Sequence, residues 1–343
     1  MKKVLIISSP FYDYQISVGR AFEELGYQIK IETYDDPIHP FRGLLKWRHK
    51  FARDKESLRA QSRAKYDAYI KQVYDNYQPD IVFSYNGTIL LDERLDYFRQ
   101  KSKVVLWIYD SVQRPDRLRC EKHIDHADAV FCFEERDVDY YAKQGKTAYF
   151  LPLACDTSVY HPLPNNDKGI DILYVATLYT SAKRMRLIKQ VVNHYPQAKI
   201  LVYGWYKPFV KMPIKWLFRE KRDVFKNKNI PPAKVNELFA RTKVALNIHH
   251  EQTFHGANQR LFEACGAGVY QVCDANPYIE SLFPNGEVGL YHNEEEMFER
   301  ISWALDENNR EERERRAYAA YNIIIEQHTF TTRVKEMLKV IGE

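Results

Sequence analysis

Residues 246–274 read LNIHHEQTFHGANQRLFEACGAGVYQVCD. The stretch opens with an apolar run, breaks into a polar loop with three histidines and a glycine, continues as a helical pattern and closes on a second apolar run. Strand, loop, helix and strand in this order form the repeating unit of an α/β fold. The polar loop holds more charged and imidazole side chains than a buried connection needs, so the stretch also indicates a site.

The same alternation extends through both halves of the chain. Near-continuous apolar strand patterns, from KKVLIISSP at the start to TAYFLPLA at 147–154, alternate with helical patterns, which is typical of a parallel sheet covered on both faces. Residues 155–167, CDTSVYHPLPNND, interrupt the alternation and resemble an interdomain linker. We therefore predict Rossmann-like, doubly wound domains at 1–154 and 168–327, with a ligand cleft at the carboxyl ends of their strands.

Length and composition agree with this organisation. A chain of 343 residues suits two domains, and 45% hydrophobic with 28% charged residues is ordinary for a globular protein. The first apolar run ends at Pro10 without a signal-peptide cleavage site, and no stretch of the sequence is long and apolar enough to span a membrane. The five cysteines show no Cys-x-x-Cys spacing, so we expect a cytoplasmic protein without a disulfide framework or zinc site.

Two segments, 41–66 and 207–228, combine clustered Lys and Arg with aromatic residues. This combination suits anionic headgroups, so we expect peripheral contact with the inner face of the plasma membrane. An alternative for the first segment is a helix whose apolar stripe packs on its own domain. Charge alone would also allow nucleic acid, but no recognition motif accompanies the charge, and we expect no nucleic-acid partner.

The polar loop HHEQTFHGA leads into the N-terminus of the next predicted helix. Helix N-termini offer unpaired N–H groups and a positive dipole end, where a diphosphate can bind. Gly256 permits close backbone approach, and Asn258 can cap the helix or contact the ligand. Arg260 can supply charge and Glu263 can offer a carboxylate to a ribose diol. We interpret the stretch as half of a nucleoside-diphosphate site; the alternative is a capped connection with an incidental arginine.

Two adjacent histidines, His249 and His250, follow the first apolar run. Either can contact phosphate or sugar hydroxyls, and either can be structural. Side chains of neighbouring residues in an extended strand point to opposite faces, so the pair is not expected to bind one metal ion.

Candidate residues for an acceptor lie in the N-terminal half. The segment LWIYDSVQRP places Asp110 where a strand meets its loop, and a carboxylate there could accept the proton of an acceptor hydroxyl. A helix cap or a hydrogen bond to a neighbouring loop is the alternative. Asp13 and Tyr14, after the first strand, and Asn86 and Gly87, in another loop, are further acceptor-binding candidates.

The quoted stretch also carries a family resemblance. RLFEACGAGVYQVCD resembles the E-A-x-A/G-x-G-x-P-V element of retaining GT-B glycosyltransferases, and LNIHH with GANQRLFEACGAG resembles the group named after the spore-maturation protein CgeB. ILYVATLYTSAKRMRLI, LPLACDTSVYHP and HTFTTRVKEML resemble that group's arginine element, interdomain hinge and terminal helix. The resemblance implies a GT-B fold in which the last helix, at about 328–343, crosses back to the N-terminal domain.

The resemblance also implies roles for individual residues. Glu263 would bind the donor ribose, and Arg184, with Lys183 or Arg186, would neutralise the diphosphate. The backbone around residues 256–258 would meet phosphate or sugar. Because fixed cations can stabilise the departing nucleoside diphosphate, no metal cofactor is expected.

Two positions depart from the family pattern. His255 stands where many retaining relatives have a second glutamate, and Ala176 stands where they have a glycine. His255 therefore joins Asp110 and His249 as a candidate catalytic residue, and the stereochemical outcome stays open.

Together these features predict a nucleotide-sugar-dependent glycosyltransferase. It would transfer a sugar from a nucleoside-diphosphate donor to a glycan, lipid-linked or protein acceptor in the synthesis of bacterial surface polysaccharide or glycoconjugates. The C-terminal domain would bind the donor and the N-terminal domain the acceptor, with closure through the linker. The alternatives are a nucleotide-sugar epimerase of the same fold and a catalytically degenerate scaffold.

Overall fold

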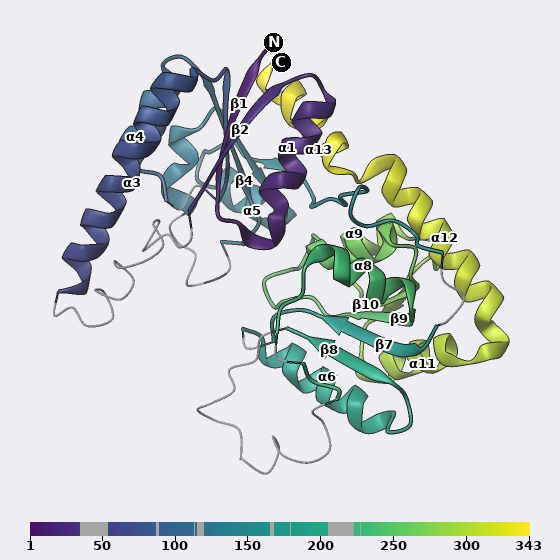
Figure 1. Cartoon of the computed structure of the whole chain (residues 1–343). Helices are drawn as coiled ribbons and strands as arrows, with labels where there is room; N and C mark the ends of the chain where they lie inside the picture. Colours follow the sequence, from purple (N-terminus) through teal and green to yellow (C-terminus); the bar gives the residue numbers. More distant parts are fainter. Residues whose placement is uncertain are drawn as a thin grey trace. The chain divides into compact units, whose positions relative to one another are not determined.

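The chain forms two compact units, each built on a parallel sheet (Figure 1). Unit 1 comprises residues 1–152 and 330–343, and unit 2 comprises residues 153–329. The predicted α/β class with two doubly wound parallel sheets is confirmed. The computed structural model describes residues 1–34, 54–86, 89–112, 114, 120–164, 168–178, 180–204, 223–226 and 228–343.

Unit 1 has a sheet in the order β2-β1-β3-β4-β5-β6, with every pair parallel. Its strands are β1 (Lys3–Ser8), β2 (Gln28–Thr33), β3 (Ile81–Tyr85), β4 (Lys103–Ile108), β5 (Ala129–Cys132) and β6 (Tyr149–Phe150). Its helices are η1 (Phe11–Asp13), α1 (Tyr14–Glu24), α3 (Lys55–Tyr77), α4 (Asp92–Arg99), η3 (Cys120–His126), α5 (Glu135–Ala142) and α13 (Phe330–Ile341). The direction of chain progression reverses between β1 and β3, so the loops after these two strands flank a topological switch point.

The terminal helix α13 is part of unit 1. It lies beside α1 (Figure 1), and the ring of Phe330 packs 6.1 Å from that of Trp107. Arg333 is 2% exposed, and its Nε donates a hydrogen bond of 2.8 Å to the carbonyl of Pro152. The first and last parts of the chain therefore share one core.

The basic segments lie largely outside the described residues. Residues 41–53 of the first and 207–222 and 227 of the second are not described, and the expected membrane contact stays a prediction. The described remainder of the first segment starts α3, whose later residues Tyr66 and Ile70 are buried in the core of unit 1. Among the described residues, none of the helices combines enough length with enough apolar character to cross a membrane.

Unit 2 has a sheet in the order β11-β10-β9-β7-β8, again with every pair parallel. Its strands are β7 (Ile170–Val175), β8 (Ile200–Tyr203), β9 (Thr242–Asn247), β10 (Gln271–Asp274) and β11 (Gly289–Tyr291). Its helices are α6 (Ala182–His194), α8 (Pro232–Ala240), α9 (Gln259–Gly266), α10 (Pro277–Leu282), α11 (Glu294–Leu305), η4 (Glu307–Asn309) and α12 (Arg310–Gln327).

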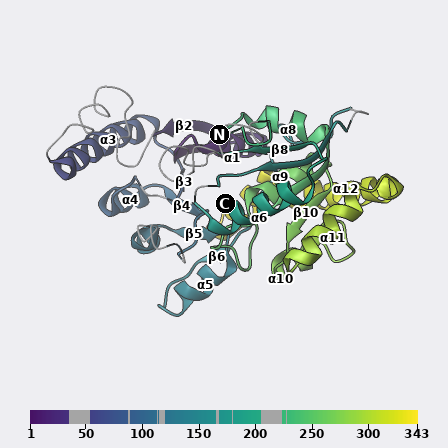
Figure 2. The ribbon, with the colours of Figure 1, turned by 90° about the horizontal axis from the view of Figure 1, so that it is seen from below.

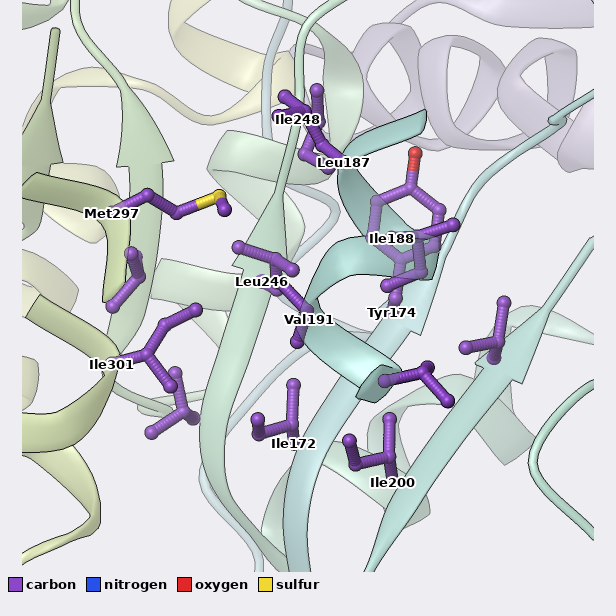
Figure 3. Close-up of a cluster of buried hydrophobic side chains, with 14 of the residues drawn as sticks. Ile172, Tyr174, Leu187, Ile188, Val191, Ile200, Leu246, Ile248, Met297 and Ile301 are labelled. Carbon is purple, nitrogen blue, oxygen red and sulfur yellow. The ribbon is translucent and has the colours of Figure 1, made fainter. Parts of the chain in front are cut away.

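One face of this sheet is covered by α6 and α11, as Figure 3 shows. Ile188 and Val191 are separated by about one helical turn, so α6 presents both to the sheet. They meet side chains from β7 and β9, among them Ile172 and Leu246, and all four are at most 2% exposed. Burial of each such side chain contributes about 1.5–3 kcal/mol, so this cluster fixes the strands that carry the site.

The opposite face of the sheet is packed tightly around Gly266 in α9. A Cβ at Gly266 would lie 2.3 Å from Sγ of Cys155, in the segment expected to be the linker. We expect Gly266→Ala to lower the free energy of unfolding by about 2 kcal/mol, because the extra methyl group overpacks the core. Urea denaturation of the variant, of Cys155→Ala and of the double variant measures this. The clash explanation requires the double variant to recover part of the loss; strictly additive effects would refute it.

Candidate functional site

A network of charged groups joins the carboxyl ends of β9 and β10 to the first turn of α6. Oδ1 of Asp274 accepts hydrogen bonds from Nδ1 of His249 at 2.7 Å and from the backbone N of His249 at 2.8 Å. Its Oδ2 lies 2.6 Å from Nζ of Lys183. Burial alone would raise the pKa of Asp274, but the charges and hydrogen bonds of His249 and Lys183 outweigh it and hold that pKa well below its usual range.

The same network contains the atoms that come closest to a metal-binding set in the described part of the chain. His249, Cys273 and Asp274 each place one ligand atom within 4.8 Å of the others. However, the ammonium of Lys183 binds the carboxylate, and burial raises the pKa of the Cys273 thiol well above its usual value. Metal ligation needs a thiolate and a carboxylate free to coordinate, so these donors fit a hydrogen-bonded network better than a metal centre.

Arg184 lies next to this network and is a buried cation. The residue is only 8% exposed. Its Nε donates a hydrogen bond of 2.8 Å to the carbonyl of Ile248, and its Nη1 donates one of 3.3 Å to the carbonyl of Thr177. No carboxylate pairs with its guanidinium among the described residues. Since a buried charge is costly without a counter-ion, Arg184 is a candidate partner for an anionic ligand.

The N-terminus of α6 already attracts anionic groups. Oγ of Ser181 caps the helix by accepting 3.1 Å from the backbone N of Arg184. The carboxylate of Glu251, in the loop after β9, accepts 3.2 Å from the backbone N of Lys183. The N–H groups of the first turn have no partner within the helix, and the helix dipole is positive at this end, which accounts for this preference. The same dipole would attract a phosphate group.

The third predicted cation, Arg186, does not join this group. Its guanidinium pairs with Glu294 of α11, and its side chain is 56% exposed. Two positions further along the helix than Arg184, it lies at the junction of two helices rather than at the strand ends.

Asn258 and Gly256 shape the loop between β9 and α9. Oδ1 of Asn258 caps α9 by accepting 3.0 Å from the backbone N of Leu261. Its Nδ2 donates 2.7 Å to Oδ1 of Asn247, which leaves the amide committed to the fold. The carbonyl of Gly256 accepts 2.9 Å from Nδ2 of Asn276, so this loop is fastened to the one after β10.

Glu263 and Arg260 form an ion pair on the buried side of α9. Oε2 of Glu263 lies 2.5 Å from Nη1 of Arg260, and the two side chains are 1% and 13% exposed. The guanidinium of Arg260 stands 5.9 Å from the ring centre of Phe239. The negative charge of Glu263 also contributes to raising the pKa of Tyr160, after the larger effect of burial.

The three histidines of the loop have different surroundings. His249 is 2% exposed, and its Nε2 has no hydrogen-bond partner in the part of the chain that the structure describes. Nε2 of His250 lies 3.0 Å from the carbonyl of Thr180 in the loop after β7, while His255 is half-buried. His249 and His250 thus contact different elements, as expected for adjacent residues of an extended segment.

In unit 1, Asp110 and Asn86 meet at the carboxyl ends of β4 and β3. Asp110 is 6% exposed. Its Oδ1 accepts a hydrogen bond of 3.0 Å from Nη1 of Arg114, and its Oδ2 accepts one of 3.2 Å from Nδ2 of Asn86. Oδ1 of Asn86 accepts 2.9 Å from the backbone N of Tyr109. The carboxyl group of Asp110 is therefore oriented by the guanidinium of Arg114 and the amide of Asn86.

Strained backbone surrounds this switch point. Tyr12 and Asp13, after β1, have φ of 50° and 60°, and Asn86, after β3, has φ of 55°. Non-glycine residues in this region cost about 1–3 kcal/mol each and concentrate at binding sites. Asp13 is exposed and Tyr14 opens α1, whereas Gly87 lies outside the described residues.

Sequence reasoning missed two buried carboxyl groups, Asp274 and Asp137. Asp137, in α5, accepts 2.7 Å from Oγ of Ser111 and 3.3 Å from the backbone N of Val112, and burial raises its pKa to about 7. Asp274 is the last residue of the strand β10. Its place at a carboxyl strand end was the signal available in the sequence.

Part of the chain is similar to a known protein family. Residues 183–339 match the model of a family described as glycosyl transferase-like. No curated protein sequence matches the chain.

Several solved structures share the fold at low sequence identity. Sucrose-phosphate synthase from Thermosynechococcus elongatus is 12% identical with a TM-score of 0.70, over 100% of this chain and 98% of that one. A UDP-forming α,α-trehalose-phosphate synthase from Burkholderia xenovorans is 12% identical with a TM-score of 0.66, over 100% and 99%. The Anabaena protein HepE, in complex with UDP and glucose, is 12% identical with a TM-score of 0.62, over 100% of both chains. The fold is therefore that of GT-B glycosyltransferases.

Proposed function

We propose that this protein is a nucleotide-sugar-dependent glycosyltransferase whose donor diphosphate binds at the carboxyl ends of β7, β9 and β10. The observation that carries the proposal is Arg184, a buried guanidinium held by two carbonyls and paired with no carboxylate in the described residues. The partial match to a glycosyl transferase-like family and the nucleotide and sugar bound by the structural neighbour HepE support the same chemistry.

The reaction requires stabilisation of the negative charge that develops on the departing nucleoside diphosphate. Arg184 and Lys183 supply fixed positive charge, and the positive end of the α6 dipole adds to it. Asp274 holds Lys183 and His249 in place. Because these cations belong to the protein, we propose that no metal ion is needed for this step.

Glu263 is proposed to bind the ribose of the donor. A carboxylate can accept hydrogen bonds from both hydroxyls of a ribose diol, and the ion pair with Arg260 holds this carboxylate in a fixed orientation. Unit 1 would bind a glycan, lipid-linked or protein acceptor near Asp13, Tyr14 and Asn86. Asp110 would accept the proton of the acceptor hydroxyl if the reaction inverts configuration.

A thermal-shift panel tests the donor site. The wild-type protein and Glu263→Gln are each melted with UDP, GDP, dTDP and CMP and with their common sugar conjugates, with and without EDTA. We expect one nucleotide to raise the melting temperature of the wild type by about 5 °C at saturation, because a ligand of the folded state stabilises it by mass action. Glu263→Gln should lose most of this shift, and Glu299→Gln, an exposed residue of α11, should keep it.

The outcomes of this panel separate the proposed enzyme from its alternatives. No shift with any nucleotide would exclude the donor site and favour a scaffold. Loss of the shift in EDTA would exclude metal-independent binding. If a nucleotide sugar binds, product analysis distinguishes transfer to an acceptor from epimerisation of the donor, which needs no acceptor.

A further inference from the structure

A cavity of about 480 Å³ lies beside β11, the edge strand of unit 2. Its lining residues come from α10, the segment between α10 and β11, β11 itself, α11 and α12, together with Tyr270 before β10 and His292 after β11. Figure 2 shows these three helices as neighbours. The volume falls within the range of about 300–1,000 Å³ that small-molecule sites occupy. None of its lining residues belongs to the proposed donor site.

Aromatic side chains form one wall of this cavity. The rings of Tyr270 and Trp303 pack with their centres 5.6 Å apart. Tyr270 is 2% exposed, and its buried hydroxyl has no hydrogen-bond partner of normal geometry among the described residues, although the guanidinium of Arg316 lies close to it. A Cβ at Gly289 would lie 2.8 Å from this hydroxyl, so the glycine keeps the space beside it open. A buried hydroxyl left in this state can still bind a polar group of a ligand.

Two guanidinium groups supply positive charge to the same cavity. Arg316 stands 4.7 Å from the ring centre of Trp303 and binds Glu312 at 2.7 Å. Arg300 donates through Nε to the carbonyl of Leu290 at 3.3 Å. No carboxylate pairs with Arg300 in the part of the chain that the structure describes, so its terminal N–H groups are available for an anion.

Two carboxylate side chains, Glu280 and Glu296, also line the cavity. His292 lies between Glu280 and Glu296, with nitrogen–oxygen distances of 2.8 Å and 3.1 Å. The hydrogen bonds that His292 donates to the carboxylates of Glu280 and Glu296 raise its pKa. Glu296, Arg300 and Trp303 recur at helical spacing along α11, so one face of this helix presents a carboxylate, a guanidinium and an aromatic ring in succession.

We propose that this cavity binds an acidic sugar, meaning a pyranose ring that carries a carboxylate or a phosphate. The ring would pack its C–H face on Trp303, and its acidic group would form charge-assisted hydrogen bonds with Arg300. Its hydroxyls would donate to Glu280 and Glu296 and accept from Tyr270. The site is separate from the donor site, and the inference holds whether or not the chain transfers sugars.

Calorimetric titration of the full chain tests this proposal. The probes are glucuronate and glucose 6-phosphate, with glucose and inorganic phosphate as the neutral and ring-free counterparts. A tetrasaccharide that contains glucuronate distinguishes a site for a free acidic sugar from a site for one unit of a glycan. We expect the acidic sugars to bind once per chain, and glucose and phosphate each to bind at least about tenfold more weakly.

Matched variants assign the binding to this cavity. Arg300→Gln should weaken it about tenfold, whereas Arg310→Gln, which alters an exposed ion pair with Glu314, should change it less than about twofold. Tyr270→Phe removes only the hydroxyl and should weaken binding, whereas Tyr318→Phe, at a residue 62% exposed, should not.

Three results would overturn the proposal. Acidic sugars could fail to bind, they could bind Arg300→Gln as tightly as the wild type, or they could lose affinity in Arg184→Gln. The last result would place the ligand in the donor site instead, and nucleotide binding by the same variants shows separately whether that donor site exists.

Discussion

Replacement of Arg184 by glutamine is expected to lower kcat/KM for the nucleotide-sugar donor by about 10²–10³-fold. Fixed donors aimed at the charge of a transition state have effects of this size, and Arg184 is buried with two carbonyls as its partners. The neutral side chain also removes a buried charge that has no counter-ion within the described ranges of the chain. We therefore expect the melting temperature without nucleotide to stay the same or to rise.

Arg186→Gln is the matched control for this experiment. Arg186 lies on the same helix, but its side chain is 56% exposed and its guanidinium pairs with Glu294. We therefore expect its replacement to change kcat/KM by less than about twofold. Steady-state kinetics and thermal melts of both variants decide the issue. If Arg184→Gln keeps full activity, or loses activity only in proportion to lost stability, the guanidinium has a structural role and the proposed diphosphate site is wrong.

Asp274→Ala is expected to lower the free energy of unfolding by about 3 kcal/mol at neutral pH. The substitution removes the carboxylate that binds both Lys183 and His249, and the loss of one partner from a buried charged network leaves the others uncompensated. Urea denaturation of the variant measures the loss. Glu299→Gln, which alters an exposed carboxylate on α11, should change the free energy by less than about 0.5 kcal/mol.

The pH dependence of this effect has a definite sign. The folded-state pKa of Asp274 is lowered by His249 and Lys183 despite burial, so ionisation of this group favours the folded state. The contribution is fully present above the unfolded carboxyl value of about 3.9 and is lost as the pH falls through the folded value. The difference in the free energy of unfolding between wild type and Asp274→Asn should therefore be constant above about pH 5 and narrow as the pH falls below about 4. A gap that widened on acidification would contradict the ion-paired network.

Much of the fold could be predicted because it depends on local patterns. Alternating strand and helix patterns predict parallel sheets, and the helix after the histidine loop begins at Gln259 with Asn258 as its cap. The strand expected over residues 147–154 is much shorter, since β6 covers only Tyr149–Phe150. Pro152 follows closely, and its missing N–H cannot extend a ladder.

The contacts within the site depend on information that these patterns lack. Lys183 and Asp274 are 91 positions apart, and they meet because β10, β9 and β7 are neighbours in the sheet. Alternation of strands and helices predicts the layers but not this order. A basic residue after one strand and an acidic residue at the end of another could be identified in the sequence, while their pairing could not.

The composition of unit 1 from two separated segments has a consequence for synthesis on the ribosome. Unit 2 is continuous from 153 to 329, whereas unit 1 needs residues 330–343 in addition to the first 152. Helix α13, which packs against Trp107 and α1, is translated only after the whole of unit 2. The nascent chain must therefore carry an incomplete first unit while the second is made and folded. During that interval the surface of unit 1 that α13 later covers is exposed, and we expect it to be a site where a chaperone binds.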